Sequence, residues 1–297
     1  MIEDISFPSE GAALRGRFYG HPRGGRAVVV MTHGTSATIT MVTDRYAEAI
    51  HAAGFDVLLY DHRNFGRSGG EPRHEINPWL QARGYRDAVA WLREERGAGR
   101  VALWGDSYSA MVVLVAAALI DDIAAVVAQI PACGISMPPV APSDEVRAQM
   151  RAILQGGDIS GGPAQTTGPL PVVSADQLNA PSLLAPIQAY RWFIEFGGRF
   201  GTGWENCATR VVPATPVPFH PALTAPYLTM PVQMMVGRED EMVHCNPAVQ
   251  RAVFDAIPGD KEFREIDGGH FGLLWYPGPL FDEAVQAQTA FLGRVLR

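Results

Sequence analysis

The sequence has few cysteines and no apolar stretch long enough to cross a bilayer. Its three cysteines are odd in number, lie far apart and lack a CxxC spacing, which argues against a disulfide framework and against a metal site of that type. The longest apolar run, residues 110–120, is too short to span a membrane. Residues 1–4 are acidic and lack the basic and apolar regions of a signal peptide. We therefore expect a cytoplasmic protein without a membrane partner.

Basic clusters are also missing. The net charge is -7, and Lys261 is the only lysine, so the chain lacks the surface that nucleic-acid phosphates require. A length of 297 residues with 47% hydrophobic residues suits one large domain with an insertion. These properties predict a globular protein that binds a small molecule and needs no metal or organic cofactor. They leave open whether the protein forms a homodimer.

Short apolar runs alternate with longer helical patterns along most of the chain. This alternation predicts an α/β fold with a mostly parallel sheet and helices on both faces. We expect an antiparallel edge strand at residues 14–19. The other predicted strands are residues 27–32, 55–60, 101–104, 124–129, 232–236 and 262–266, and the predicted helices are residues 44–53, 78–96, 109–119, 248–257 and 281–297.

One Pro- and Gly-rich stretch, residues 134–226, breaks the alternation. A structureless loop of this length is improbable inside a domain, so we predict a helical cap inserted into a core of residues 1–133 and 227–297. One helix should start after Ser143 and end at Gly156, and another should lie around residues 183–196. The alternative is a peripheral decoration. The second helix carries Trp192, Phe193 and Phe196, which either line the substrate pocket or pack as core.

The sequence Gly-Asp-Ser-Tyr-Ser at residues 105–109 lies between an apolar strand and an apolar helix. This strand–turn–helix context is typical of a nucleophile elbow, in which a sharp turn lifts a serine above the sheet. The turn requires small residues two positions before and after the nucleophile. Gly105 meets this requirement, and Ser109 stands where glycine is usual. We therefore predict Ser107 as the nucleophile.

Two further groups follow late strands. Asp240 comes after the strand at 232–236, and His270 lies on a glycine-rich turn after the strand at 262–266. A hydroxyl, an imidazole and a carboxylate in the chain order serine, acid, histidine suit this nucleophile elbow. Glu239 and Glu241 compete with Asp240 for the role of the acid.

An oxyanion hole is also predicted. The backbone N–H of Tyr108 lies at the start of the helix that follows Ser107 and can donate to a developing oxyanion. The second donor is expected on the His-Gly turn after the strand at 27–32, from the backbone N–H of Thr35, with Ser36 as the alternative. We expect His33 to brace this turn.

These motifs resemble the α/β-hydrolase superfamily. Residues 61–70 look like its Asp-x-Arg-x-x-Gly-x-Ser turn, and with Ser107, Asp240 and His270 the resemblance covers the chain except the cap. The chain is most similar to dienelactone-hydrolase-like and X-prolyl-peptidase-like serine hydrolases. Residues 72–88 also resemble a subgroup that includes fungal polyketide acyltransferases. A serine nucleophile departs from the cysteine of true dienelactone hydrolases and from the aspartate of dehalogenases and epoxide hydrolases.

The predicted activity is hydrolysis of an ester or related acyl bond through an acyl-enzyme on Ser107, for a small and apolar substrate. The sequence leaves three alternatives to this activity open. An acyltransferase or a C–C bond hydrolase would use the same residues, and a non-enzymatic binding protein would not need all three of them.

Overall fold

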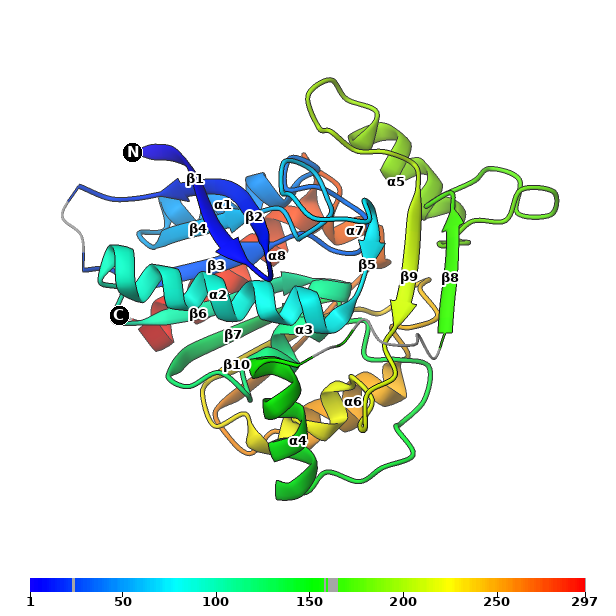
Figure 1. Ribbon diagram of the computed structural model, residues 1–297. Coiled ribbons are helices and arrows are strands. Elements are labelled where there is room, and N and C mark those ends of the chain that lie inside the picture. Colours follow the sequence, from blue (N-terminus) through cyan, green and yellow to red (C-terminus); the bar gives the residue numbers. More distant parts are fainter. Residues whose placement is uncertain (23–24, 158, 160–164, 297) are drawn as a thin grey trace.

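The computed structural model describes residues 1–22, 25–157, 159 and 165–296 (Figure 1). Its central sheet has eight strands in the order β1-β2-β4-β3-β6-β7-β10-β11. Strand β2 runs antiparallel to both of its neighbours, and all other adjacent pairs are parallel. This confirms the predicted mostly parallel sheet. The strands are β1 (Ile2–Ser9), β2 (Ala12–Tyr19), β3 (Val28–Thr32), β4 (Asp56–Tyr60), β6 (Val101–Asp106), β7 (Ile123–Gln129), β10 (Val232–Gly237) and β11 (Lys261–Ile266).

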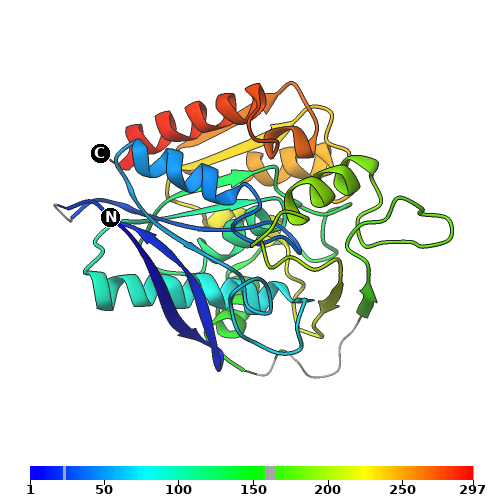
Figure 2. The ribbon, with the colours of Figure 1, turned by 90° about the horizontal axis from the view of Figure 1, so that it is seen from above.

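Helices cover both faces of this sheet. Figure 2 shows α1 and α8 on one side and α2 on the other. Successive side chains of a strand point to opposite faces of the sheet, so β3 contributes to the apolar core on each face. Val28 and Val30 pack with α2 and α3, whereas Val29 and Met31 pack with α1 and α8. The flanking helices are α1 (Thr43–Ala52), α2 (Pro78–Arg96), α3 (Tyr108–Ala116), α6 (Pro247–Asp255) and α8 (Pro279–Leu296).

The predicted edge strand at residues 14–19 is not the edge. Strand β1 lies outside β2 and pairs with it through a tight turn in which Glu10 and Gly11 both have positive φ. In β1 only alternate side chains, among them Ile5 and Phe7, are buried. A strand with one exposed face has no continuous apolar run, which is why the sequence pattern did not reveal it.

The segment 134–226, which the sequence predicts as one cap, packs against the rest of the chain in two separate places. Helix α4 (Asp144–Gln155) begins at Ser143, whose Oγ accepts from the backbone N–H of Val146 at 3.2 Å. It packs beside α2, where the guanidinium of Arg83 donates to the carbonyls of Ile153 and Gly156 at 2.7 Å each. This part of the segment therefore covers flanking helices and lies away from the end of the sheet. Residues 158 and 160–164 of the segment lie outside the described residues.

The rest of the segment contributes two strands to a second, smaller sheet, and residues 75–76 of the predicted core contribute the third. Three short strands pair in the order β5-β9-β8 beside α5, at the end of the main sheet from which the loops after β6 and β10 emerge (Figure 1). The sequence did not predict these strands. Strand β5 has only two residues, β8 has no buried side chain, and in β9 only Ala208 is buried. They are β5 (Glu75–Ile76), β8 (Gln165–Leu170) and β9 (Ala208–Val212), with helix α5 (Ile187–Gly197) between the last two.

Three short helices complete the fold: α7 (His270–Leu273) after β11, and the 3-10 helices η1 (Pro221–Leu223) and η2 (Ala225–Tyr227). Among the described residues, no helix combines the length and apolarity that a membrane span would need.

Candidate active site

A sharp turn joins β6 to α3 and carries Ser107. Its backbone has φ 53° and ψ -116°, a conformation that residues other than glycine rarely adopt and that strained functional turns often contain. A Cβ atom on Gly105 would collide with the carbonyl of Ser109, so the tightness of the turn explains the small residue there. The turn places Ser107 beyond the end of β6, above the sheet.

The three residues predicted as nucleophile, acid and base lie in one hydrogen-bonded chain. The Nε2 atom of His270 lies 2.9 Å from the Ser107 Oγ, and its Nδ1 lies 2.9 Å from the Asp240 Oδ2. All three side chains are buried. With Nδ1–H donating to the carboxylate, Nε2 is free to accept the proton of the serine hydroxyl.

The two competing glutamates occupy different positions. The carboxylate of Glu241 accepts the backbone N–H of His270 at 2.8 Å, so it holds the start of α7 and does not touch the imidazole ring. Glu239 is exposed. Asp240 has both oxygens engaged, because its Oδ1 accepts the backbone N–H of Met242 at 2.9 Å. Of the three candidate acids, Asp240 is therefore the one in contact with the His270 ring.

Helix α7 is anchored from two sides by buried aromatic side chains. The hydroxyl of Tyr46 donates to the carbonyl of Leu273 at 2.6 Å, and Nε1 of Trp192 donates to the carbonyl of Leu274 at 2.8 Å. Since His270 is the first residue of α7, these bonds connect α1 and α5 to the element that positions the imidazole.

The predicted oxyanion donors flank Ser107. Tyr108 is the first residue of α3, and the N–H groups in the first turn of a helix have no partner inside that helix. Thr35 lines the cavity beside Ser107, whereas Ser36 is not among the residues that line it. Thr35 therefore stays the predicted second donor, with Ser36 as the alternative.

A buried network ties the oxyanion loop to the elbow, and the sequence analysis predicted only the bracing part of His33 in it. The Ser109 hydroxyl donates to the carbonyl of His33 and accepts from Nε2–H of His62 at 2.7 Å. The backbone N–H of His62 donates to Nε2 of His33 at 3.2 Å, and Nδ1–H of His33 donates to the carbonyl of Gly34 at 2.7 Å. The signal in the sequence for the part of Ser109 was its departure from the glycine that is usual at this position.

Both histidines of this network are neutral at physiological pH. Burial lowers the pKa of His33 to about 4 and lowers the pKa of His62 well below its usual value. A neutral imidazole offers one donor and one acceptor. The His33 ring uses both nitrogens, and the His62 ring donates through its Nε2–H. Ser109 and the two histidines thus hold the loop of Thr35 in place without adding charge.

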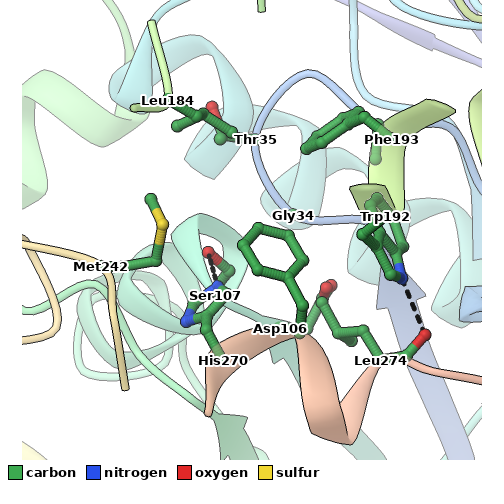
Figure 3. Close-up of a pocket in the computed structure, with 12 residues that line it drawn as sticks. Gly34, Thr35, Asp106, Ser107, Leu184, Trp192, Phe193, Met242, His270 and Leu274 are labelled. Atoms are coloured by element: carbon green, nitrogen blue, oxygen red, sulfur yellow. Dashed lines mark hydrogen bonds between the residues drawn. The ribbon is translucent and has the colours of Figure 1, made fainter. Parts of the chain in front are cut away.

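A small cavity lies over Ser107 (Figure 3). Its volume of about 20 Å³ is roughly the space that one water molecule needs, so a substrate must displace side chains to enter. Trp192 and Phe193 line it, as predicted for this helix. It is lined by Gly34, Thr35, Ala37, Asp106, Ser107, Leu184, Trp192, Phe193, Met242, His270, Phe271 and Leu274.

Phe196, the third aromatic residue predicted to bind substrate, is not among the residues that line this cavity. It lies one helical turn beyond Trp192, and its ring packs against the ring of Trp275 at a centroid distance of 5.2 Å. Its part in substrate binding stays a prediction.

Two groups of described residues bring three metal-ligating side chains within 4.8 Å of one another. One contains Asp240 and His270 together with Cys245, whose sulfur lies 3.5 Å from the His270 Nδ1. Burial raises the pKa of this thiol well above its usual value. The other group is His21, His51 and Asp56, on the strand and helix ends away from Ser107.

The chain is similar in sequence and in fold to several known proteins. A family model described as serine aminopeptidase, S33, matches residues 24–156. The thiohydrolase aneE of Aspergillus aculeatus is 30% identical over 97% of this chain and 91% of its own length. The polyketide transferase af380 of Aspergillus fumigatus is also 30% identical, over 99% of this chain and 98% of its own. The solved structure of DcsB in complex with its substrate analogue superposes with a TM-score of 0.73 at 23% identity, covering 100% of this chain and 99% of that one.

Proposed function

Because this chain belongs to the α/β-hydrolase family, together with thiohydrolases and polyketide transferases of that fold, we propose that it is a serine hydrolase of carboxylic acyl bonds. The observation that carries this proposal is the buried chain of contacts from Ser107 through His270 to Asp240. The substrate class is an ester or thioester of a small acyl group, and no cofactor takes part in the reaction.

The reaction proceeds in two steps. His270 accepts the proton of the Ser107 hydroxyl as its oxygen attacks the carbonyl carbon, and the imidazolium then gives this proton to the leaving alkoxide or thiolate. Asp240 holds the Nδ1–H tautomer and stabilises the imidazolium. The N–H groups of Tyr108 and Thr35 donate to the tetrahedral oxyanion, each worth about 3–4 kcal/mol in comparable sites. A water molecule, deprotonated by His270, then releases the acid and restores Ser107.

Covalent labelling tests this proposal most directly. A fluorophosphonate should form a stable adduct on Ser107 of the native protein, located by peptide mass spectrometry. The same protein should hydrolyse p-nitrophenyl esters. A native protein that neither reacts with the probe nor hydrolyses any ester would refute a serine-hydrolase function and favour a binding role.

An acyltransferase is the second candidate, and the similarity to the polyketide transferase af380 supports it. In such an enzyme an alcohol or amine replaces water in the second step, and the degree to which the site excludes water decides between the two reactions. Product analysis with a competing alcohol distinguishes the two. Ester formation that exceeds hydrolysis at millimolar alcohol would identify a transferase.

We further propose that β8, α5 and β9, together with the loops between them, act as the cap of the site. Leu184 and Trp192 reach the cavity from this part of the chain. Their apolar side chains suit the apolar part of an acyl group. Trp192 also packs against Phe271, with ring centroids 5.7 Å apart, so it contributes to stability as well as to the pocket.

Leu184→Ala is expected to shift chain-length preference. Removing this buried side chain enlarges the cavity, so kcat/KM for p-nitrophenyl octanoate should rise about tenfold relative to the acetate, given the 1–3 kcal/mol that such pocket contacts are worth. The matched control is Leu178→Ala, which lies in the same segment with its side chain 90% exposed. The same octanoate-to-acetate ratio in both variants would place the acyl site elsewhere.

Ser109→Ala is expected to impair the oxyanion loop. The change leaves the His33 carbonyl and the His62 Nε2–H without their partner, and kcat should fall about tenfold while KM stays within about twofold. The inhibition constant of phenylboronic acid, which forms a tetrahedral adduct on the nucleophile, should rise by a similar factor. An unchanged inhibition constant would limit Ser109 to a structural role. Ser6→Ala, an exposed serine on β1, is the control.

A further inference from the structure

Two histidines and an aspartate gather at the edge of the main sheet opposite the candidate active site. His21 follows β2, His51 lies in the last turn of α1, and Asp56 is the first residue of β4. Strands β4, β3 and β6 run parallel to one another, so the start of β4 and the end of β6, which leads to Ser107, lie at opposite edges of the sheet. The cluster therefore takes no part in the proposed reaction.

Asp56 holds His21 through two contacts. The Asp56 side chain is 8% exposed, and its Oδ1 accepts the backbone N–H of His21 at 2.8 Å and lies 2.9 Å from Nδ1 of the His21 ring. Two ligands at about 2.0–2.1 Å from a tetrahedral zinc ion are about 3.3 Å apart. The ring nitrogen and the carboxylate oxygen therefore already have nearly the spacing of two ligands of one ion.

His51 supplies the third side chain. A carbonyl oxygen can only accept, so Nδ1–H of His51 donates to the carbonyl of Phe55 at 3.1 Å, and in the neutral ring Nε2 keeps its lone pair. Metal-bound histidines usually donate their other ring N–H in this way, which fixes the tautomer and the orientation of the ring. The bond to Phe55 therefore prepares Nε2 as a ligand.

The three groups are close enough to share one ion. One ligand atom from each side chain lies within 4.8 Å of the other two. A point at most about 2.8 Å from all three atoms therefore exists, and zinc requires about 2.0–2.2 Å. The rings of His21 and His51 pack with centroids 4.0 Å apart and planes tilted by 39°, so their planes converge on one side. The His21 side chain is 21% exposed, and rotation of its ring closes the remaining distance.

We propose that His21, His51 and Asp56 bind a divalent transition-metal ion, and that zinc fits the site best. Two imidazole nitrogens and one carboxylate oxygen are ligands that zinc accepts, with water in the fourth position of a tetrahedron. Calcium and magnesium suit the site poorly, because they prefer six or more ligands, most of them oxygen. The bound ion connects the end of β2 to the junction of α1 and β4, so it stabilises the folded state.

Zinc binding is measured by isothermal titration calorimetry on protein that has been treated with a chelator and dialysed. The native protein should bind one zinc ion per chain. Zinc at about a hundred times its dissociation constant should raise the midpoint of thermal unfolding by about 5 °C. Magnesium at the same concentration should leave this midpoint unchanged.

His21→Phe should weaken zinc binding by at least about tenfold. Phenylalanine keeps a ring beside His51 and removes the nitrogen that faces Asp56, and even the loss of an outer partner of a metal ligand costs about 10–100-fold in affinity. His51→Asn should have a similar effect, because its NH₂ can still donate to the Phe55 carbonyl but offers no ligand nitrogen. The control is Glu48→Gln, at an exposed position on α1 one helical turn before His51, which should bind zinc within about twofold of the native protein.

Each outcome supports or overturns the proposal. Zinc that neither binds the native protein nor raises its unfolding midpoint overturns it. Zinc that binds the native protein and both histidine variants equally well also overturns it, because the ion then lies elsewhere, and a parallel loss of ester hydrolysis would place it at His270 and Asp240. If one histidine variant does not fold, the other decides. Fluorophosphonate labelling of Ser107 does not depend on this cluster, so the proposed function is tested separately.

Discussion

Replacing Ser107 with alanine is expected to lower kcat/KM for ester hydrolysis by at least about a thousandfold, as removal of a triad nucleophile does in other enzymes. The variant loses the oxygen that attacks the carbonyl and the acceptor of the acyl group. The elbow should persist, because the turn depends on the small residue Gly105 and on the backbone N–H of Ser107, which donates to the carbonyl of Gln129 at 2.8 Å. The measurements are p-nitrophenyl ester hydrolysis and fluorophosphonate labelling.

Two controls accompany this variant. Thermal unfolding should change little, because one oxygen is removed and no cavity larger than an atom is created. Ser6→Ala, on the exposed side of β1, should retain native rates. Hydrolysis by Ser107→Ala at the native rate would show that another group is the nucleophile, and a loss of the folded state would require Ser107→Gly in its place.

Asp240→Asn is expected to lower kcat by about a thousandfold to ten-thousandfold, as the same exchange does in a serine protease triad. The Oδ1 of Asp240 accepts from the backbone N–H of Met242, and an asparagine oxygen can replace it there. The asparagine NH₂ would then face Nδ1 of His270. Two donors cannot pair, so the imidazole would adopt the tautomer that cannot accept the serine proton.

The neighbouring glutamates provide the comparison. Glu241→Gln keeps an oxygen that can accept the His270 backbone N–H, so its loss should stay within about tenfold. Glu239→Gln alters an exposed side chain and should behave like the native protein. If Glu241→Gln instead causes the largest fall in kcat at constant thermal stability, the acid is Glu241 and Asp240 supports the loop.

Much of the fold was predictable because its signals are local. The buried parallel strands β3, β4, β6, β7 and β10 are continuous apolar runs, and helix α2 has its expected bounds, Pro78–Arg96. Asn77 caps this helix by accepting from the backbone N–H of Trp79. Apolar periodicity, capping residues and tight turns act between residues a few positions apart, and such interactions can be read directly from the sequence.

The same holds for part of the candidate site. The elbow at residues 105–109 is a local turn, so its residue types and its place between strand and helix carried the prediction of Ser107. Asp240 and His270 were predicted from their positions after parallel strands, whose carboxyl ends meet at one edge of the sheet. Their catalytic roles remain predictions for the variants above.

Other features depended on tertiary contacts. The sequence by itself predicted seven strands of the main sheet, the longer helices and the chain order of the three catalytic candidates. Only the packed structure decided which carboxylate reaches the His270 ring, that Ser109 joins His62 to His33, and that α4 packs beside α2. These outcomes depend on the directions of single side chains from elements far apart in the sequence. A pattern of residues along the chain carries no information on such directions until the elements pack against one another.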